Sequence, residues 1–232
     1  MRKHIVVLSG AGISAESGLR TFRDNQGLWE QYPIEDVATP GAFYKNPQRV
    51  LDFYNMRRRE VLQVKPNEAH IALAQLEKKY PVTVITQNID DLHERAGSSN
   101  VLHLHGEIFK MRSASDETII KEIRGDIKLG DKASDGSQFR PHIVWFEEPV
   151  PLIEMAADIM TTAEIFILIG TSLQVYPAAG LLQYIPVHAK KYIIDPQIPA
   201  IAFHEKTYIC IEKNGTEGMA ELFKMLINEN AL

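Results

Sequence analysis

The first apolar run of the chain is Ile5-Val-Val-Leu8, and it continues directly into Ser9-Gly10-Ala11-Gly12-Ile13-Ser14-Ala15-Glu16-Ser17-Gly18. Four consecutive β-prone apolar residues without alternation are typical of a strand that is buried on both faces of a sheet. Glycines immediately after such a strand permit a tight turn and let backbone N–H groups approach a pyrophosphate at the start of a helix. The stretch therefore predicts a first strand and a phosphate-binding turn, with a purely structural strand-to-helix turn as the alternative.

Three further apolar runs of the same kind follow, at residues 82–86, 165–169 and 192–194. Helical patterns lie between them, among them residues 68–79 and 152–162. Buried strands that alternate with helices form parallel sheets with helices on both faces. The sequence therefore predicts the α/β class and a Rossmann-like parallel sheet.

Two segments interrupt this alternation and are interpreted as insertions that form a small lobe. Residues 26–63 are aromatic-rich and helical in pattern, whereas residues 111–139 are polar and poor in large apolar side chains. The second segment has too little apolar surface for a core of its own, so it must pack on the rest of the chain or be mobile. The expected organisation is a single domain over residues 1–232, with a core of about residues 1–25, 64–108 and 140–232 and a lobe of about residues 26–63 and 109–139.

The composition indicates in which compartment the protein works and which kinds of partner it can bind. The chain has 232 residues, a formal net charge of −5 and one cysteine, Cys210. One cysteine forms neither an internal disulfide nor a cysteine zinc site, which favours the cytoplasm. The apolar run 5–8 is too short for a signal peptide or a membrane span. A negative charge disfavours nucleic-acid backbones, so we expect neither a nucleic-acid nor a membrane partner, and cationic targets such as lysine-rich peptides fit better.

The glycine turn lacks the G-x-G-x-x-G spacing of dehydrogenases, and no acidic residue ends a second strand about 20 positions later, so a dehydrogenase is disfavoured. Six further motifs follow in chain order: Leu19-Arg20-Thr21-Phe22-Arg23, Thr86-Gln87-Asn88-Ile89-Asp90, His103-Leu104-His105-Gly106, Arg140-Pro141-His142-Ile143-Val144-Trp145-Phe146, Gly170-Thr171-Ser172-Leu173 and Val175-Tyr176-Pro177-Ala178. With the glycine turn they resemble the sirtuin family, in the family's order and over nearly the whole chain.

The resemblance implies NAD as the cofactor. In the family, the glycine turn and the position of Arg23 hold the NAD phosphates and ribose, and the positions of Gln87, Asn88 and Asp90 line the nicotinamide side of the pocket. These polar residues follow the carboxyl end of a predicted strand, where parallel sheets bind ligands. Helix capping is the alternative role of Asn88 and Asp90. The expected NAD-binding residues are Gly10, Ala11, Gly12, Ser14, Phe22, Arg23, Gln87, Asn88, Asp90, Gly170, Thr171, Ser172 and Asp195.

His105 resembles the catalytic histidine of the family, and the expected catalytic residues are His105, Asn88 and Asp90. An imidazole is suited to this role because it can exchange a proton with a ribose hydroxyl near neutral pH. His103 is interpreted as a packed structural histidine. The two histidines could also suggest a metal pair, but no suitable third ligand is evident nearby, so no metal site is predicted.

The resemblance implies an NAD-dependent protein-lysine deacylase. The acyl-lysine carbonyl oxygen would attack the ribose C1′ of NAD as nicotinamide leaves, and His105 would activate the ribose hydroxyls. The implied products are nicotinamide, the deacylated lysine and 2′-O-acyl-ADP-ribose. Alternatives that remain open are plain deacetylation, transfer of ADP-ribose to protein or water, and an NAD-binding module that has lost catalysis.

The substrate-binding residues follow from two motifs. The β-prone segment Val144-Trp145-Phe146 could pair with an extended substrate backbone and leave an apolar tunnel for the lysine, with a plain core strand as the alternative. The family often has Phe-Gly-Glu where this chain has Phe146-Glu147-Glu148, so close approach of a backbone at Glu147 is in doubt.

Tyr54 and Arg57 are one helical turn apart in residues 48–63, so their side chains can point to the same spot. Members of the sirtuin branch that removes succinyl, malonyl or glutaryl groups carry Tyr-x-x-Arg here, and Ala38 matches the small residue that widens their pocket. The guanidinium could bind the distal carboxylate of such an acyl group bidentately. The alternative is a solvated basic face made by Arg57-Arg58-Arg59.

Two departures from the family concern zinc and adenosine. Most sirtuins hold structural zinc with four cysteines in the region equivalent to residues 111–139, where this chain has only residues such as Ser113, Ser115, Ser134 and Asp135. Hydroxyls do not replace thiolates as structural zinc ligands, so we predict no zinc. Asp195 stands where the family commonly places asparagine against the adenosine ribose, and a carboxylate can still accept a hydroxyl hydrogen bond.

Overall fold

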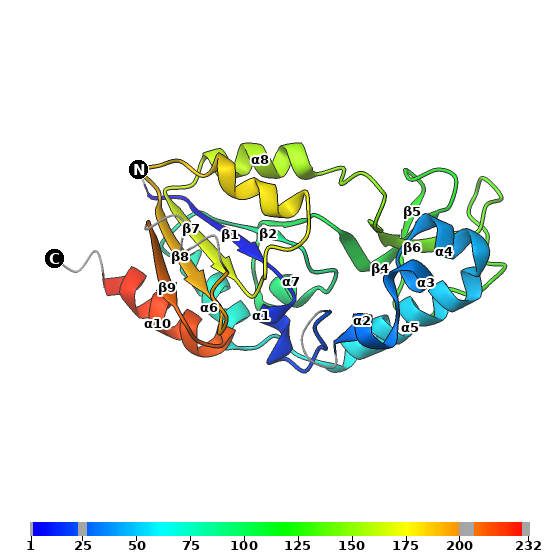
Figure 1. Cartoon of the computed structure of the whole chain (residues 1–232), viewed down its shortest axis with the longest axis horizontal. Coiled ribbons are helices and arrows are strands. Elements are labelled where there is room, and N and C mark those ends of the chain that lie inside the picture. The colour runs from blue at the N-terminus through cyan, green and yellow to red at the C-terminus, as the bar shows by residue number, and fades with distance from the viewer. Residues whose placement is uncertain (1, 23–26, 200–206, 229–232) are drawn as a thin grey trace.

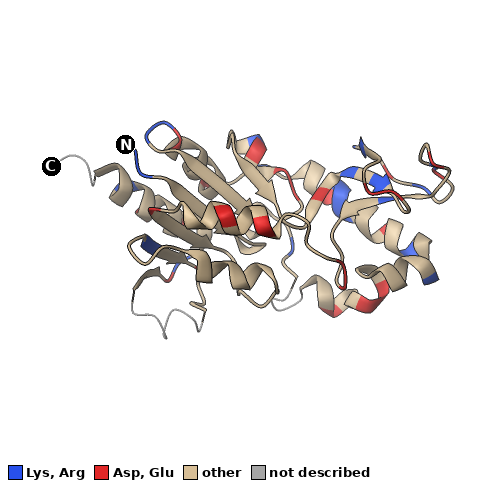
Figure 2. Cartoon of the chain, turned by 90° about the horizontal axis from the view of Figure 1, so that it is seen from above, with Lys and Arg blue, Asp and Glu red and all other residues tan. Residues whose placement is uncertain are grey.

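The structure is a computed structural model that describes residues 2–22, 27–199 and 207–228. Figures 1 and 2 show two lobes from perpendicular directions: a large lobe built on one sheet, and a smaller lobe formed by residues 28–63 and 106–143. The small lobe is therefore assembled from two segments that are far apart in the sequence.

The large sheet is formed by β1 (Ile5–Ser9), β2 (Val82–Thr86), β3 (Val101–His103), β7 (Ile165–Ile169), β8 (Lys190–Ile194) and β9 (Tyr208–Ile211). Its strands are parallel and lie in the order β3-β2-β1-β7-β8-β9. The predicted α/β class and Rossmann-like sheet are confirmed, and the four apolar runs correspond to β1, β2, β7 and β8. The sequence does not predict the edge strands β3 and β9, because they are only partly buried and lack a continuous apolar run.

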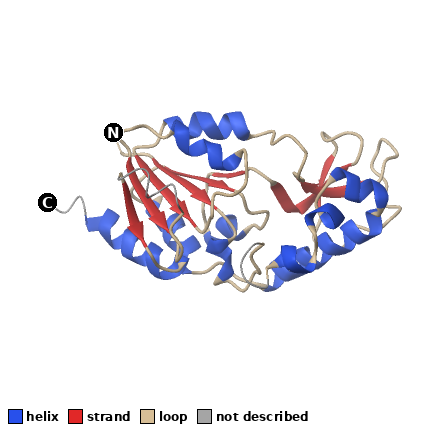
Figure 3. Cartoon of the chain, in the orientation of Figure 1, coloured by secondary structure: helices blue, strands red, loops and turns tan. Residues whose placement is uncertain are grey.

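Helices cover both faces of this sheet (Figure 3). They are α6 (Glu68–Leu76) and α10 (Gly215–Asn228) on one face, and α8 (Ile153–Thr161) and the 3-10 helix η1 (Ala178–Tyr184) on the other. Ile5 and Val7 of β1 pack toward the first pair of helices, and Val6 and Leu8 pack toward the second pair. All four side chains are fully buried, and burial of each contributes about 1.5–3 kcal/mol. This two-sided burial explains why β1 has no alternation of apolar and polar residues.

The helical part of the small lobe consists of α2 (Leu28–Gln31), α3 (Ile34–Val37), α4 (Pro40–Lys45) and α5 (Pro47–Gln63). Capping side chains fix where the last two helices begin. The Thr39 side chain accepts a hydrogen bond from the Ala42 amide at the start of α4, and the Asn46 side chain accepts one from the Arg49 amide at the start of α5. A proline follows each cap, at a position where a helix needs no amide donor. The helical pattern over residues 48–63 is thus realised as α5.

The polar segment 111–139 contributes to an antiparallel sheet that consists of β4 (Gly106–Ser113), β5 (Ile120–Glu122) and β6 (Phe139–Ile143), in the order β5-β4-β6. Ile127, Ala133 and Phe139 form a small apolar cluster only together with Leu51 of α5. The segment therefore packs on the rest of the chain, as its lack of large apolar side chains requires.

Hydrogen bonds tie the far end of this segment together. The Ser113 hydroxyl donates to Asp135 Oδ2 at 2.5 Å and accepts hydrogen bonds from the amides of Ser115 and Asp116. The Ser137 hydroxyl donates to the Ser115 hydroxyl at 2.8 Å. Ser113, Ser115 and Asp135, which are named above for this segment, are thus joined by hydrogen bonds.

Within the described ranges, every helix is too short or too polar to traverse a lipid bilayer.

Candidate active site

A cavity of about 930 Å³ lies at the carboxyl ends of β1 and β7. The strand order reverses between these two strands, since β1 leads to β2 and β3 on one side and β7 leads to β8 and β9 on the other. Open parallel sheets bind ligands at such a switch point. The volume is near the upper end of the range of about 300–1,000 Å³ that is typical of small-molecule sites. Trp29 and Phe53 of the small lobe form part of the opposite wall.

Two glycine turns form one wall of the cavity. Gly10 and Gly12 follow β1, and Gly170 follows β7. A Cβ atom at position 12 would lie only 2.7 Å from the Cα of Gly170. Gly170 has φ 62°, in the left-handed region that favours glycine. The two turns can therefore approach this closely only without side chains, and they leave a smooth cradle of backbone for a ligand.

Most amides of the first turn are already used within the protein. The Gly10 amide donates to the Ile169 carbonyl at 3.1 Å, and the Gly12 amide donates to the Gly170 carbonyl at 2.9 Å. Among the described residues, the Ala11 amide makes no such bond. The Ala11 amide is therefore the donor of this turn that can face a pyrophosphate. The glycines contribute by leaving space that side chains would fill.

Gln87 and Asn88 leave the carboxyl end of β2 and line the same cavity. One N–H of each carboxamide is fixed within the chain: Gln87 Nε2 donates to Thr171 Oγ1 at 3.0 Å, and Asn88 Nδ2 donates to Ser14 Oγ at 3.1 Å. Fixed carboxamides can recognise ribose hydroxyls and another carboxamide without a further loss of side-chain freedom.

Asp90 and Ser14 lie behind this wall and do not line the main cavity. With Arg57 they line a small cavity of about 20 Å³ next to Asn88. Asp90 Oδ1 accepts from the Leu92 amide at the start of α7 (Leu92–Ala96), and Oδ2 accepts from the Ser14 hydroxyl, both at 3.1 Å. Burial raises the pKa of Asp90, and these two hydrogen bonds oppose the shift. Ser14 and Asp90 thus support Asn88 from behind, and Asp90 also accepts an amide hydrogen bond at the start of α7, while their contact with NAD stays a prediction.

His105 lines the main cavity beside Gln87. Its Nδ1 atom lies 3.1 Å from the Gln87 carbonyl oxygen. A carbonyl can only accept, so Nδ1 carries the proton of this bond and Nε2 of the neutral ring is an acceptor. Burial lowers the pKa of His105, and the hydrogen bond to Gln87 opposes the shift. The ring is therefore neutral at pH 7 and can act as a base.

His103 has no free ring nitrogen for a ligand. Its Nδ1 atom is 3.0 Å from the Asn88 carbonyl oxygen, and its Nε2 atom is 2.6 Å from Glu94 Oε1. Burial lowers the pKa of His103, but the hydrogen bond and charge of Glu94 outweigh burial and raise the pKa overall. These contacts agree with a structural role. In the part of the chain that the structure describes, no group of three His, Cys, Asp or Glu side chains is arranged to hold a metal ion.

Two further histidines lie below the glycine turn and are not singled out by the sequence. His70 and His93 are fully buried, with ring centroids 4.9 Å apart. His93 Nε2 is 2.9 Å from the Ser9 hydroxyl, and His70 Nε2 is 3.5 Å from the Ser14 hydroxyl. Burial lowers the pKa of His70 to about 4 and that of His93 well below the ordinary value. Both rings therefore support the turn as neutral groups.

Ala38 and Tyr54 line the end of the cavity that the small lobe contributes. Both are buried, and the Tyr54 ring packs 5.0 Å from the Phe53 ring and 6.3 Å from the Trp145 ring, measured between centroids. Burial raises the pKa of Tyr54, so its hydroxyl stays protonated and can donate a hydrogen bond.

Arg57 lines the same end of the cavity. Only 5% of its side chain is exposed, and Nη1 donates to Glu60 Oε2 at 2.6 Å. Burial lowers the pKa of Arg57, and Glu60 opposes the shift. The alternative of a solvated basic face holds only for Arg59, because Arg58 is also buried and donates to the Ile108 carbonyl oxygen.

The segment after β6 joins the two lobes. The Val144 amide donates to the His105 carbonyl and the Phe146 amide to the Ala38 carbonyl, both at 3.0 Å. The Trp145 amide donates to Glu148 Oε2 at 2.8 Å. All three amide donors are thus engaged, so the expected pairing with an extended substrate backbone is limited to carbonyl oxygens of this segment.

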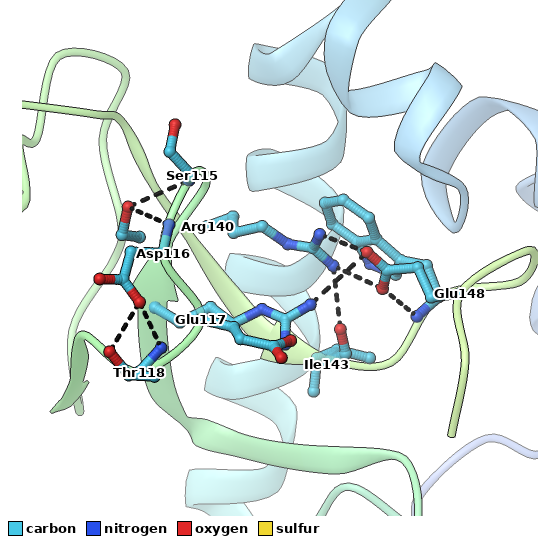
Figure 4. A network of polar contacts seen from close by, with 10 residues as sticks. Ser115, Asp116, Glu117, Thr118, Arg140, Ile143 and Glu148 are labelled. Carbon is cyan, nitrogen blue, oxygen red and sulfur yellow. Dashed lines mark hydrogen bonds and ion pairs between the residues drawn. The ribbon is translucent and has the colours of Figure 1, made fainter. Parts of the chain in front are cut away.

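Glu148 holds that segment in place (Figure 4). Arg140 donates from Nη1 to Glu148 Oε1 at 2.6 Å and from Nη2 to Oε2 at 2.9 Å. The Arg140 guanidinium also stacks 3.2 Å from the centroid of the Trp145 ring. Glu147 has φ 73°, in the left-handed region that glycine favours, and its side chain is exposed.

The cavity thus joins most of the residues that the sequence predicts for NAD, catalysis and substrate. They are Gly10, Ala11, Gly12, Phe22, Ala38, Tyr54, Arg57, Gln87, Asn88, His105, Val144, Trp145, Phe146, Gly170, Thr171, Ser172 and Asp195. Arg23 lies outside the described residues. The sequence does not single out the apolar lining residues Trp29 and Phe53, because their aromatic helical pattern indicates packing and does not distinguish a ligand wall from a core.

Comparisons with known proteins agree with this geometry. The model of the Sir2 family matches residues 10–177. An NAD-dependent protein deacylase of Bacteroides thetaiotaomicron is 53% identical over 97% of this chain and 98% of its own length. One of Helicobacter pylori is 52% identical, with the same coverage. A solved Sir2 homologue variant in complex with ADP-ribose superimposes with a TM-score of 0.91 at 36% identity, covering 100% of this chain and 94% of its own. A Sir2 homolog–NAD complex gives a TM-score of 0.88 at 38% identity, covering 98% and 90%.

The matched family model spans well over half of the chain, and the relatives are similar over almost its whole length. The chain belongs to the Sir2 family.

Proposed function

We propose that the protein is an NAD-dependent protein-lysine deacylase that removes acetyl groups and also succinyl and malonyl groups. The observation that carries the proposal is a single cavity that runs from the glycine cradle and His105 to the buried Arg57 and Tyr54. Two relatives at 52% and 53% identity are named NAD-dependent protein deacylases, and similar solved structures hold ADP-ribose or NAD.

The residues fit the parts of NAD. When bound, NAD supplies a ribose carbon that accepts the acyl oxygen as the bond to nicotinamide breaks. The side-chain-free cradle of Gly10, Gly12 and Gly170 suits a pyrophosphate. Asp195, at the end of β8, offers acceptor oxygens to the adenosine ribose. These residues would hold the dinucleotide with its reactive end toward His105.

Catalysis rests on His105. Its Nε2 atom is the acceptor of a neutral ring that the Gln87 carbonyl orients. We assign it the removal of a proton from a ribose hydroxyl, whose oxygen would then bond to the acyl carbon. The bond from that carbon to the lysine nitrogen would break, one water would supply the carbonyl oxygen of the acyl group, and the lysine amine and 2′-O-acyl-ADP-ribose would leave. Asn88 presents its carboxamide to the nicotinamide side, and Asp90 positions it through Ser14. No protein nucleophile is needed.

Recognition of a dicarboxylic acyl group rests on Arg57 and Tyr54. A guanidinium that is 5% exposed at the end of an apolar channel meets a carboxylate without competition from bulk water. The protonated Tyr54 hydroxyl can donate a second hydrogen bond to the same carboxylate. An acetyl group has no charge for either residue to bind, so it gains nothing from them.

The test is a kinetic comparison of matched acetylated and succinylated peptides at saturating NAD. Arg57→Met should lower kcat/KM for the succinylated peptide at least about tenfold more than for the acetylated one. Arg59→Met is the matched control, because Arg59 is exposed and pairs with Asp126 at the surface. Equal losses on both peptides would refute the role of Arg57 in carboxylate recognition, and a wild type that acts on the acetylated peptide alone would be a plain deacetylase. ADP-ribose bound to protein in place of the acylated small molecule would indicate a transferase.

The same proposal covers the remaining properties of the chain. We propose a single catalytic domain over residues 1–232 with the lobe boundaries predicted above, and a small lobe that folds without zinc because Ser113, Ser115 and Asp135 bind one another. The proposed partners are acylated lysines of other proteins, with no role for nucleic acid or membrane. The single Cys210 favours a cytoplasmic setting.

A further inference from the structure

Three charged side chains form a chain of ion pairs at the small-lobe end of the cavity. Glu60 lies one helical turn after Arg57 on α5, and its Oε2 atom accepts from Arg57 Nη1 at 2.6 Å. Its other oxygen, Oε1, accepts from Arg20 Nη2 at 2.8 Å. The side chain of Arg57 is 5% exposed, whereas Glu60 and Arg20 are 32% and 36% exposed. One carboxylate therefore bridges two guanidinium groups, and the three residues together carry a single positive charge.

Arg57 remains incompletely satisfied by this pairing. Its Nε atom is buried without a hydrogen-bond partner in the described part of the chain. Only Nη1 is used by Glu60. Buried polar groups normally have partners, and an unused edge of a buried guanidinium is a site for a planar acceptor such as a carboxylate. Arg57 is therefore built to share its charge between Glu60 and a ligand.

We propose that Glu60 is a specificity-determining residue that weakens the binding of dicarboxylic acyl groups by competing for Arg57, and that Arg20 limits this competition. This inference rests on the proposed role of Arg57 in carboxylate recognition. Once an acyl carboxylate reaches Arg57, two negative groups share one guanidinium and repel each other. Arg20 neutralises part of that repulsion because it holds the second oxygen of Glu60.

This arrangement lets the pocket accept both neutral and negatively charged acyl groups. Without a ligand carboxylate, Glu60 compensates the buried charge of Arg57, so a neutral acetyl group meets no unpaired cation. With a succinyl group, Arg57 binds both carboxylates. The charge of Glu60 therefore sets the ratio of desuccinylation to deacetylation, while the chemistry at His105 stays the same for both acyl groups.

The test is Glu60→Gln, which removes the charge but keeps an acceptor oxygen for Arg57. We expect the ratio of kcat/KM for succinylated over acetylated peptide to rise about threefold or more, through a lower KM for the succinylated peptide. An unchanged ratio, a lower ratio or a rise through kcat alone overturns the inference. Asp52→Asn is the matched control on α5, since Asp52 is exposed and bonds only Gln48 among the described residues.

Arg20→Gln gives an independent measurement with the opposite sign. It should lower the same ratio about threefold, because Glu60 then competes more strongly for Arg57. An unchanged or higher ratio overturns the inference. Arg57→Met, measured alongside, separates the two claims: if it leaves the ratio unchanged, the proposed recognition by Arg57 fails. If it lowers the ratio while the two variants leave it unchanged, only the role of Glu60 and Arg20 fails.

Discussion

His105 Nδ1 donates a hydrogen bond to the carbonyl oxygen of Gln87, at 3.1 Å, and so leaves Nε2 as the basic atom of the ring. Gln87 follows β2 and His105 follows β3, so the parallel pairing of these strands sets the contact. The same residue that offers its carboxamide to the cavity thus orients the base through its backbone. The pairing of β2 with β3 therefore fixes both the position of the imidazole and the ring nitrogen that carries its proton.

The pH dependence of catalysis follows from this contact. Burial lowers the pKa of His105 below its ordinary value of 6.5, and the reaction needs the neutral ring. We expect the acid limb of kcat/KM for the acylated peptide at saturating NAD to have its midpoint below about pH 6.5, the value of an ordinary histidine. A pH–rate profile checks this. An acid limb with its midpoint above pH 7 would mean that His105 is not the neutral base described.

The buried pair His70 and His93 makes the fold sensitive to acid. The unfolded chain binds protons at these residues below about pH 6.5, whereas folding lowers the pKa of His70 to about 4. Stability is therefore highest above pH 6.5 and is lost as the pH falls toward 4, by up to about 3 kcal/mol for His70 alone. Urea unfolding at several pH values measures this loss. His70→Gln should flatten the dependence, and a wild-type stability that does not change between pH 7 and pH 4.5 would contradict the expectation.

The ion pair of Arg140 and Glu148 holds the segment after β6, residues 144–146, which lines the main cavity. Both side chains are largely buried, with 7% and 16% exposed. Glu148→Gln leaves Arg140 as an uncompensated buried charge and should lower the free energy of unfolding by about 3 kcal/mol. Asp126→Asn breaks the exposed pair with Arg59 and should cost less than about 1 kcal/mol. Chemical denaturation of the two variants provides the comparison, and equal effects would refute the structural role of Glu148.

The small lobe should hold its shape without metal. Ser113, Ser115, Asp135 and Ser137 form hydrogen bonds with one another in the segment 111–139, where we predict no zinc site. Incubation with a strong chelator should leave both the melting temperature and deacylation unchanged, and metal analysis should find no stoichiometric zinc. One zinc per chain, or loss of activity that added zinc restores, would contradict this prediction.

The sequence predicts those parts of the fold that are buried on both sides. Val82–Thr86 and Ile165–Ile169 are found at the predicted residues because both are continuous β-prone runs without charged residues, Gly or Pro. The strands of the small lobe are not predicted, since Ile120–Glu122 is exposed and the neighbouring Ile127 and Phe139 pack on Leu51 of α5, far away in the sequence. Tertiary contacts of this kind leave no local periodicity.

For the site, the motif resemblance identifies the residues, but it does not tell which of them line the cavity and which lie behind its wall. Asn88 and Asp90 stand two positions apart, yet only Asn88 lines the main cavity, because Asp90 turns back to cap α7. The ion pairs of Glu60 are likewise not predictable. Arg20 and Glu60 are 40 residues apart, and only the fold brings them together.

We propose that one cavity transfers an acyl group from lysine to ADP-ribose with His105 as the base. Mass spectrometry of a reaction with NAD and a succinylated peptide follows this transfer. We predict equal amounts of nicotinamide, deacylated peptide and O-succinyl-ADP-ribose for the wild type, and a loss of deacylated peptide of at least about a hundredfold for His105→Ala. Deacylated peptide with free succinate and no nicotinamide, or undiminished product formation by the variant, would contradict the account.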